Sequence, residues 1–462
     1  MEILVNSGLV KIVGVFAYDT RKDPKRFTLD GYHTMHMIDL PSSIHRKEVD
    51  NIIDGTRLFY KNTYYSEFRD LMFTGRDRVE EDGIQKNKIT KLQRTLSLAG
   101  HFILRNNETL KFITNEQELF LFPDGIGIFS ISFEVSNQPI SYSSNLINQA
   151  REFTSNVENL LGNKEHFHKW ISTNIISTIS IVGDNLEVDE YSGSKFKTYA
   201  VFDVSETSEN LTYNRDHLLF ELGTSSPIGT VAGTGRNKPS PMYYDLLMEN
   251  KLSAFANYEG LALLDSFTVI GTSNYSNLSN NNTDYFQHHT WNRTYFSIYI
   301  FNLYVRYNLF KFNSLFLTNP VKYRNKFQQF LNQNNFTHIS FNFLPNMVFS
   351  IMRNSLGIEA EIEKFEKRLS NLAASIQEGQ EKRQAFLLSL ISIISSISAA
   401  KDIKQSIVAM QISLGWNVVF FYTVIFSIIT ILGLIVLVYL FPLHAQKLKK
   451  KLINFVHRVK EK

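Results

Sequence analysis

Short apolar runs alternate with amphipathic stretches and turn clusters from Gly8 to about Leu264. Runs rich in β-branched residues and phenylalanine predict strands, whereas apolar residues recurring every three to four positions predict helices. The predicted strands are Val10–Ala17, Leu119–Phe122, Gly127–Phe133, Ile175–Val182 and Tyr199–Val204, and the predicted helices are Ser144–Leu161 and Met242–Leu252. We therefore expect an α+β or α/β domain over residues 1–285, closed by the polar stretch Gly271–Tyr285.

A helical section is expected over residues 286–384. It begins with a segment dense in aromatic residues, His288–Phe316, whose charges at Arg306 and Lys311 argue against a membrane span and for a helix on a larger helical surface. Pro345 can start the next helix, because its missing amide donor is not needed in a first turn. A continuous helix from Asn346 to Ala400 would be about 80 Å long.

Apolar residues within this long helix follow the rhythm of a coiled-coil seam. Six of them are spaced 4, 3, 4, 3 and 4 residues apart: Ile358, Ile362, Phe365, Leu369, Leu372 and Ile376. The same register runs upstream with only Ser355 failing, and downstream it meets Gly379 and Arg383. The seam predicts either packing against the preceding aromatic helix or self-association, and both can hold at once.

Two apolar segments predict membrane-spanning helices over residues 385–441. Trp416–Phe441 has 26 residues without a charge, and Ala385–Ala400 has 16, against a need of roughly 20 for a helix that spans a bilayer. A short outer loop over 401–415 would join them. Basic residues before the first span and after the second predict that both chain ends lie in the cytoplasm, with the protein in the inner (plasma) membrane.

Charge supports membrane lipid as a partner more than nucleic acid. The chain carries a formal charge of +4, and the last twenty residues hold seven Lys or Arg against one Glu. This excess lies on one tail, residues 442–462, instead of being spread over a folded face, so we expect no direct nucleic-acid binding. The tail's apolar residues recur at helical spacing, which predicts a helix along the inner leaflet.

The order of these segments resembles the CorA-like family of two-span metal-ion channels. Members of that family have an α/β domain, a stalk helix, two spans and a basic tail; they are pentamers, and a Gly-Met-Asn signature at the end of the first span selects hydrated magnesium. This chain lacks the signature, and Gly415-Trp416-Asn417 lies before the second span instead. The resemblance implies a homo-oligomeric pore gated by its cytoplasmic domain, and divergent members imply a nucleotide-activated effector of bacterial antiviral defence. The alternatives are a Mg²⁺ transporter and a membrane-tethered binding or scaffold protein without conductance.

The first predicted span carries the candidate pore residues. Ser389, Ser392 and Ser396, extended by Ala399, fall on one helix face and predict either a pore lining or close helix packing. Lys401, Asp402 and Asn417 are the candidates for an outer pore mouth, with a solvated loop as the other interpretation.

One loop has the composition of an anion site. The stretch GTSSPIGTVAGTG is rich in glycine and hydroxyl residues, and basic residues follow it. Exposed amides in such a loop can hold a phosphate, although a plain surface loop has the same composition. The candidate nucleotide-binding residues are Gly229, Gly233, Gly235, Arg236 and Lys238.

No pattern predicts an enzyme. The chain has no cysteine, which excludes disulfides, iron–sulfur clusters and cysteine nucleophiles, and the spacings of serine-hydrolase and zinc-protease motifs do not occur. We expect no catalytic residue, no resident metal and no certain cofactor; a permeating Mg²⁺ or other cation and a nucleotide ligand are the candidates.

Overall fold

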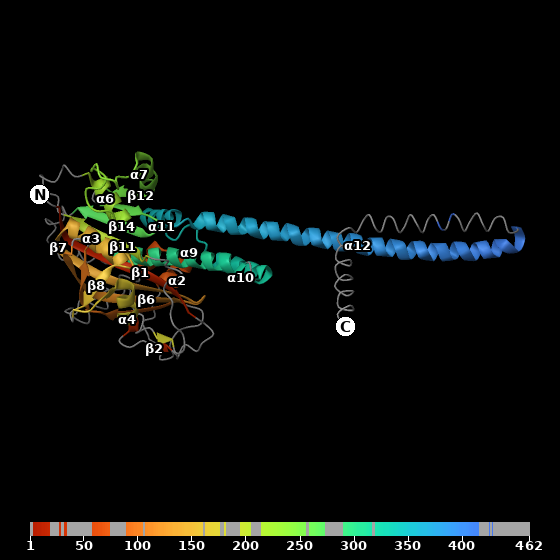
Figure 1. Cartoon of the computed structure of the whole chain (residues 1–462), viewed down its shortest axis with the longest axis horizontal. Helices are drawn as coiled ribbons and strands as arrows, with labels where there is room; N and C mark the ends of the chain where they lie inside the picture. Colours follow the sequence, from red (N-terminus) through yellow and green to blue (C-terminus); the bar gives the residue numbers. More distant parts are fainter. Residues whose placement is uncertain are drawn as a thin grey trace, which may run out of the picture. The chain divides into compact units, whose positions relative to one another are not determined.

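The computed structural model describes most of the first 414 residues and two isolated positions beyond them. The described residues are 3–18, 27–28, 32–34, 58–73, 89–104, 107–159, 162–175, 180–181, 195–204, 214–255, 258–272, 290–316, 319–414, 425 and 427. The chain divides into two compact units, unit 1 over Met1–Lys367 and unit 2 over Arg368–Lys462. Each unit is described by itself below (Figure 1).

Unit 1 is built on a mixed sheet of twelve strands among the described residues. Its main path runs β12-β13-β14-β11-β1-β7-β6-β5-β8-β9, and β4 joins it by pairing with β6 on one side and β3 on the other. The strands of the path are β12 (Lys251–Phe255), β13 (Tyr258–Ala262), β14 (Ser266–Thr272), β11 (Lys197–Val204), β1 (Leu4–Ala17), β7 (Ile126–Pro139), β6 (Thr109–Phe122), β5 (Ala99–Ile103), β8 (Asn156–Asn159) and β9 (Lys164–His166). The joining strands are β4 (Thr90–Thr95) and β3 (His33–Thr34), and β2 (Phe27–Thr28) pairs separately with β10 (Ser180–Ile181).

Most neighbouring strands are antiparallel, and β11 with β14 is a parallel pair. Strand β1 lies at the centre, between β7 and β11, and its residues from Val10 to Phe16 are fully buried. The apolar run that predicts a strand over Val10–Ala17 is thus confirmed, because a strand covered on both faces reads as a continuous apolar run.

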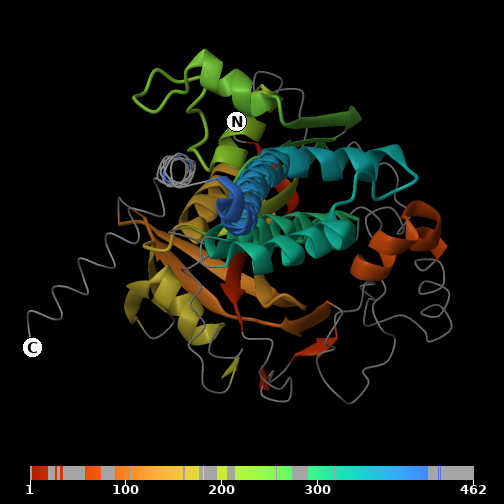
Figure 2. The same ribbon diagram turned by 90° about the vertical axis from the view of Figure 1, so that its right-hand side faces the viewer.

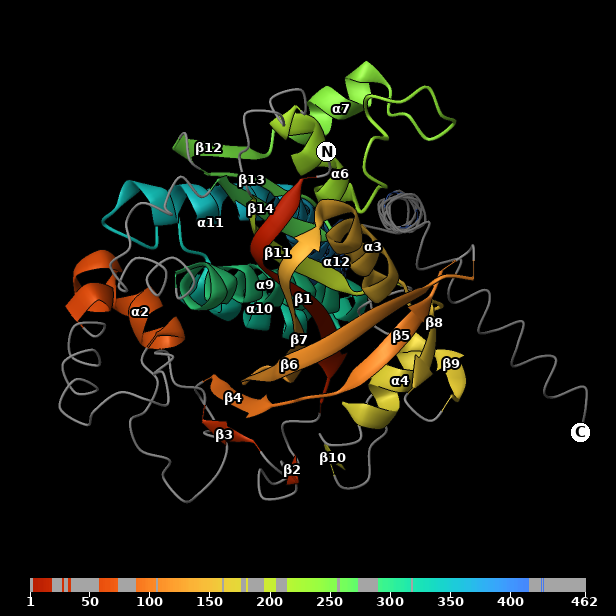
Figure 3. The ribbon, with the colours of Figure 1, turned by 90° about the vertical axis from the view of Figure 1, so that its left-hand side faces the viewer.

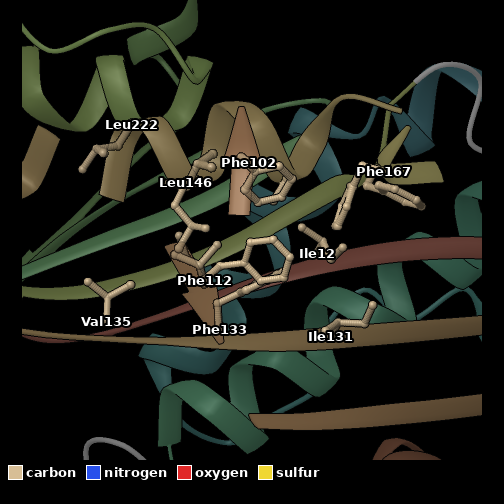
Figure 4. Close-up of a cluster of buried hydrophobic side chains, with 14 of the residues drawn as sticks. Ile12, Phe102, Phe112, Ile131, Phe133, Val135, Leu146, Phe167 and Leu222 are labelled. Carbon is tan, nitrogen blue, oxygen red and sulfur yellow. The ribbon is translucent and has the colours of Figure 1, made fainter. Parts of the chain in front are cut away.

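One face of the sheet is covered by α3 (Ile140–Arg151), α4 (Phe167–Asn174) and α6 (Arg215–Thr224). The side chains between them and the sheet form one continuous apolar cluster, in which Ile12, Ile131, Phe133, Phe112, Phe102, Leu146 and Phe167 are buried (Figure 4). This cluster is the main core of unit 1. The short helix α7 (Pro241–Met248) follows α6 and has no buried residue.

Two glycines shape the centre of this core. Gly127 pairs with Phe16 across β7 and β1, and Gly14 pairs with Phe129. A Cβ atom on Gly127 would lie 2.2 Å from the Phe16 ring, and one on Gly14 would lie 2.3 Å from the Phe129 ring. Each glycine therefore makes room for the ring opposite it.

The other face of the sheet is covered by helices from distant parts of the sequence (Figures 2 and 3). They are the π-helix η4 (Thr290–Tyr295), α9 (Phe296–Phe316) and α11 (Phe343–Ser355), and α2 (Ser66–Met72) and α10 (Pro320–Asn334) pack against α9. Helix α9 is buried on nearly all sides, which explains its aromatic composition better than a helix exposed on one face. Its expected helical character is confirmed.

The long helix divides in two. Helix α11 ends at Ser355, Gly357 has a φ of 64°, and α12 (Ile358–Leu414) begins directly after it. The left-handed backbone at Gly357 ends α11, because residues other than glycine rarely adopt it. The predicted continuous helix from Asn346 to Ala400 is therefore wrong at its start, and α12 continues beyond Ala400.

The first part of the predicted seam packs within unit 1. Phe365 lies with its ring centroid 4.0 Å from that of Phe327 in α10 and 5.0 Å from that of Phe316 in α9, and Ile358 and Ile362 are also buried. Packing against the aromatic helix before the seam is confirmed for Phe365. Leu369 and Leu372, farther along, are half-exposed.

The expectation of a two-span membrane protein is not supported. No helix in the described part of the chain combines the length and the apolar character needed to cross a membrane. The first predicted span, Ala385–Ala400, is an internal part of the 57-residue helix α12, and charged residues lie on both sides of its 16 uncharged positions. The predicted outer loop is helical as far as Leu414. For the described residues this corrects the predicted fold class, the inner-membrane location and the ion-channel character.

The second predicted span, Trp416–Phe441, lies outside the described residues apart from Ile425 and Ser427, and so does the tail 442–462. Gly415, Trp416 and Asn417 lie outside them as well. The predicted closing loop Gly271–Tyr285 is described only to Thr272, where β14 ends.

Candidate functional site

A cluster of charged side chains is buried at the centre of unit 1, between the sheet and η4. We call it the central charge cluster; its members are Lys11 on β1, Glu116 and Glu118 on β6, Ser130 on β7 and Arg293 on η4. The side chains of Lys11 and Glu118 are 0% exposed, that of Arg293 is 3% exposed and that of Glu116 is 23% exposed. Charged side chains this deeply buried need partners, because leaving water costs each of them several kcal/mol.

Every charged group of the cluster has a partner within hydrogen-bond distance. Lys11 Nζ donates to Glu118 Oε2 at 2.6 Å, and Ser130 Oγ donates to the same oxygen at 2.5 Å. Arg293 bridges the two carboxylates, because its Nη1 donates to Glu118 Oε1 at 2.7 Å and its Nη2 donates to Glu116 Oε1 at 3.0 Å. Lys11 Nζ also lies 3.9 Å from the centre of the Phe296 ring. Two cations and two anions thus balance, and together they fasten η4 to the sheet.

The sheet register explains how these residues meet. Lys11 pairs with Ser132 on β7, and Ser132 pairs with Glu116 on β6, so the side chains of these three residues point to the same face of the sheet. Glu118 pairs with Ser130 and lies two residues farther on the same face. Arg293 reaches this face from the π-helix. π-Helices are rare in proteins, and those that occur are often found at functional sites.

Burial shifts the titration of the cluster. Desolvation lowers the pKa of Lys11, and the nearby Glu118 and Glu116 carboxylates oppose that shift. Desolvation also raises the pKa of Glu116, with a further rise from the Glu118 charge, and Arg293 opposes it. The net pKa shifts of Lys11 and Glu116 therefore both favour the neutral form, and the opposite charges nearby reduce each shift.

A second buried cation lies on the same sheet face, at β4. Lys91 pairs with Phe120 of β6, two residues beyond Glu118, and is 8% exposed. Its Nζ has no hydrogen-bond partner among the described residues, and desolvation lowers the pKa of the amine to about 7. An amine in this environment is close to half neutral at neutral pH.

The glycine-rich loop binds a carboxylate of the protein itself, that of Glu221. Glu221 on α6 is fully buried; its Oε2 accepts from the amide of Gly229 at 2.9 Å, and its Oε1 accepts from the amide of Val231 at 2.7 Å. The amide of Gly233 donates to the carbonyl of Gly229. Of the candidate nucleotide-binding residues, Gly229 and Gly233 therefore use their amides internally.

The remaining candidates of that loop, Gly235, Arg236 and Lys238, are exposed. The structure places them along one surface loop that leads to the N-cap of α7 at Ser240. Arg236 and Lys238 are therefore exposed to solvent. The loop amides of Gly229 and Val231, which could have bound an external anion, bind the Glu221 carboxylate instead. Nothing in the composition of the loop signalled that α6 would supply this carboxylate.

The candidate pore residues lie on α12, within unit 2. The hydroxyl group of Ser389 donates a hydrogen bond to the carbonyl of Ala385, one turn earlier in the helix. Ser392 is exposed. Ser396, Ala399 and Lys401 are helical positions whose side chains are outside the described part, and Asp402 is helical and exposed. The expected pore mouth at Lys401 and Asp402 is therefore part of a helix and not of a loop, and Asn417 lies outside the described residues.

The opposite side of this part of α12 is apolar and exposed. Six large side chains are 37–67% exposed: Phe386, Leu387, Leu388, Leu390, Ile391 and Ile394. At about 100° per residue they and Ile393 cover roughly 220° of the helix circumference and leave Ser389, Ser392 and Ser396 on the remaining arc. A contiguous apolar surface of this kind marks an interaction site.

Sequence reasoning missed the central charge cluster. Its signals were single charged residues inside apolar strands, such as Lys11 between Val10 and Ile12, and the sequence does not show which of them meet. Among the described residues no group of three or more His, Asp or Glu side chains gathers closely enough to hold a metal ion. Comparison with protein-family models, curated proteins and solved structures found no match to this chain.

Proposed function

We propose that this chain is a non-enzymatic, self-associating protein, in which α12 joins copies of the chain and unit 1 serves as the ligand-responsive part. The observation that carries the proposal is the exposed apolar face of α12 at Phe386–Ile394. Burying one such leucine or phenylalanine contributes about 1.5–3 kcal/mol. A face that wide is stable in water when other helices cover it.

The coiled-coil seam supports other copies of this chain as the covering helices. Its first positions, Ile358, Ile362 and Phe365, are filled by packing within unit 1, whereas Leu369 and Leu372 are only half-buried. From Gly379 and Arg383 the same seven-residue spacing leads to Phe386 and Leu390, inside the exposed face. The seam therefore continues beyond its intramolecular part and meets the apolar face in phase.

Unit 1 supplies the arguments for a ligand-responsive part. The central charge cluster fastens η4 to the sheet through four charged groups, and the loop after α6 is closed by the Glu221 carboxylate. Buried ion pairs can hold a domain in one arrangement at a cost in stability. A nucleotide as the ligand, a role in antiviral defence and a pentamer stay predictions that rest on the resemblance to CorA-like proteins.

The mass of the full-length chain in solution tests the proposal. Light scattering is expected to give a multiple of 53.4 kDa for the natural sequence. The variant Leu390→Asp should raise the dissociation constant at least about tenfold, because it removes an apolar contact and buries a charge at the interface. The matched control is Ser392→Asp, about 200° around the same helix, which should leave the mass unchanged.

A control for folding and a refuting outcome complete the test. Circular dichroism must show that both variants keep the helix content of the natural chain, so that a loss of mass reports the interface and not the fold. A natural chain that stays at 53.4 kDa at all concentrations, or equal effects of the two variants, would refute self-association through this face.

A further inference from the structure

Another cluster of charged side chains lies in unit 1, where β11 and β14 begin. We call it the cationic cluster; its members are Arg151 at the end of α3, Lys197 on β11, Arg306 on α9 and one carboxylate, Asp265, directly before β14. Strands β11 and β14 are parallel, so both begin at the same edge of the sheet. Arg306 is one of the two charges that interrupt the aromatic segment His288–Phe316.

The Asp265 carboxylate binds two of the three cations. Lys197 Nζ donates to its Oδ1, and Arg151 Nη2 donates to its Oδ2 at 3.3 Å. Arg151 Nη1 also donates to the hydroxyl of Ser225 at 3.0 Å and to the carbonyl of Thr224 at 3.3 Å, at the end of α6. The side chains of Lys197 and Arg151 are 11% and 12% exposed, so both cations are largely removed from water.

The third cation, Arg306, reaches the cluster from α9. On β11 the side chain of Tyr199 lies on the same face as that of Lys197, and its ring centroid is 5.6 Å from that of Tyr299 on α9. Arg306 follows Tyr299 by seven residues, which is two turns along the same face of α9. Burial lowers the pKa of Lys197, and the charges of Arg306 and Arg151 lower it further, so Arg306 acts electrostatically on the cluster.

Three polar atoms around the cluster are buried and have no hydrogen-bond partner in the described part of the chain. They are Arg306 Nη1, Arg151 Nε and the hydroxyl oxygen of Tyr299. Burial raises the pKa of the Tyr299 hydroxyl, and the charge of Asp265 adds to this rise, so the hydroxyl keeps its proton and can donate. All three groups are donors without an acceptor, and leaving a buried donor in this state is unfavourable.

The charges of the cluster do not balance. In the central charge cluster two cations face two carboxylates, whereas the described members here are three cations and one carboxylate. Burial alone would raise the pKa of Asp265, yet the three cations together lower it, so the carboxylate is ionised at neutral pH and two positive charges remain in excess. A phosphate group carries about −1.5 to −2 charges at pH 7 and three strong acceptor oxygens, and so offers both the charge and the acceptors that the cluster lacks.

We propose that the cationic cluster binds a phosphate group through Arg151, Lys197 and Arg306. The hydroxyl of Tyr299 is a further donor to it. The Asp265 side chain is 30% exposed, so the ligand reaches the cations from that side and competes with this carboxylate for them. The inference rests on the proposed role of unit 1 as the ligand-responsive part, and adds the chemical class of the ligand and its site.

Isothermal titration calorimetry of the full-length chain with inorganic phosphate, at constant ionic strength, tests the site. The expected result is saturable binding of one phosphate per chain. The variant Arg306→Gln should weaken the binding at least about tenfold, because it removes a charged donor. The matched control is Arg324→Gln, which removes the same charge from an exposed position on α10 and should leave the dissociation constant unchanged.

The variant Asp265→Asn separates a binding site from a purely structural cluster. It removes the competing carboxylate, so phosphate should bind at least about fivefold more tightly, whereas a structural role predicts no gain. Titration with phenyl phosphate identifies the source of the group: comparable affinity supports a phosphate carried on a larger molecule, and binding of inorganic phosphate alone supports the free ion.

Two outcomes overturn the proposal. One is the absence of binding at millimolar phosphate to both the natural chain and Asp265→Asn. The other is equal weakening by Arg306→Gln and Arg324→Gln, which would show an adventitious ion on surface charge only. Circular dichroism checks that each variant keeps its fold. Either outcome leaves self-association standing, because the mass of the chain is measured separately.

Discussion

Lys11 Nζ lies 2.6 Å from Glu118 Oε2, and neither side chain is exposed to solvent. The two residues are more than a hundred positions apart in the sequence, and Arg293, from a third region, binds the same carboxylate. Three distant segments therefore depend on one carboxylate, which accepts hydrogen bonds from Lys11, Ser130 and Arg293.

The variant Lys11→Met is expected to lower the free energy of unfolding by about 3 kcal/mol, because it leaves negative charge in the core without its nearest cation. Urea-induced unfolding followed by fluorescence measures the change. The double variant Lys11→Met/Glu118→Gln should recover part of the loss, since it also removes the unbalanced charge. A double variant that loses the sum of the two single effects would contradict the coupling.

The pH dependence of stability should carry the signature of Lys91. Burial lowers its pKa from 10.5 to about 7, so between these values the unfolded chain binds more protons than the folded one. Stability contributed by this residue therefore rises with pH over that window, by up to about 1.4 kcal/mol per pH unit, and the full penalty is present below pH 7. The variant Lys91→Met should be more stable than the natural chain at about pH 6.5, and the difference should shrink at about pH 9.5. Denaturant unfolding at both pH values measures it; a pH-independent difference would contradict the assignment.

The glycine opposite Phe16 should not tolerate a methyl group. In Gly127→Ala the new Cβ would lie 2.2 Å from the ring of Phe16, which is fully buried and cannot move aside freely. Overpacking of this kind costs about 1–3 kcal/mol, which calorimetry should detect as a lowered Tm. Gly235→Ala is the matched control, because a Cβ atom at that position would meet nothing within 4 Å and the Tm should not fall.

The loop after α6 should open when its carboxylate is changed. Glu221→Gln places an amide group where the carboxylate accepts two backbone hydrogen bonds, from Gly229 and Val231. Losing one such bond in a buried site costs about 1–3 kcal/mol, so hydrogen exchange at these two amides should accelerate roughly 5- to 150-fold. Trypsin cleavage after the exposed Arg236 should accelerate with it. Glu249→Gln, an exposed change nearby, should alter neither rate.

The local sequence pattern was enough to predict the elements that are apolar throughout. Strand β1 follows from the run Val10–Ala17, and α9 follows from the density of aromatic residues over His288–Phe316, because both are buried on most sides. The predicted helix Ser144–Leu161 is wrong beyond Arg151, since Asn156–Asn159 forms β8 between β5 and β9. The predicted helix Met242–Leu252 ends at Met248 for a similar reason: Lys251 begins β12.

The break between α11 and α12 had a signal in the sequence. Gly357 directly precedes the seam at Ile358, and a glycine at such a point is the usual end of a helix. The predicted strand Ile175–Val182 is wrong at Ile175, which is the C-cap residue of α4, and only Ser180–Ile181 is a described strand within it. The central charge cluster could not be predicted in this way. It depends on the strand order and register that bring β1, β6, β7 and η4 together, and neither can be deduced from the local sequence around its members.

The position of β1 in the sheet also fixes a temporal order during synthesis. Its neighbours are β7, from Ile126, and β11, from Lys197, so β1 is synthesised before both of them and can complete its pairing only after they have followed. At about 5–20 residues per second, the roughly 100 residues before β7 take on the order of 5–20 s. During that interval a nearly continuous apolar strand has no sheet to join. In a newly made chain β1 is therefore exposed to aggregation or chaperone binding during this interval.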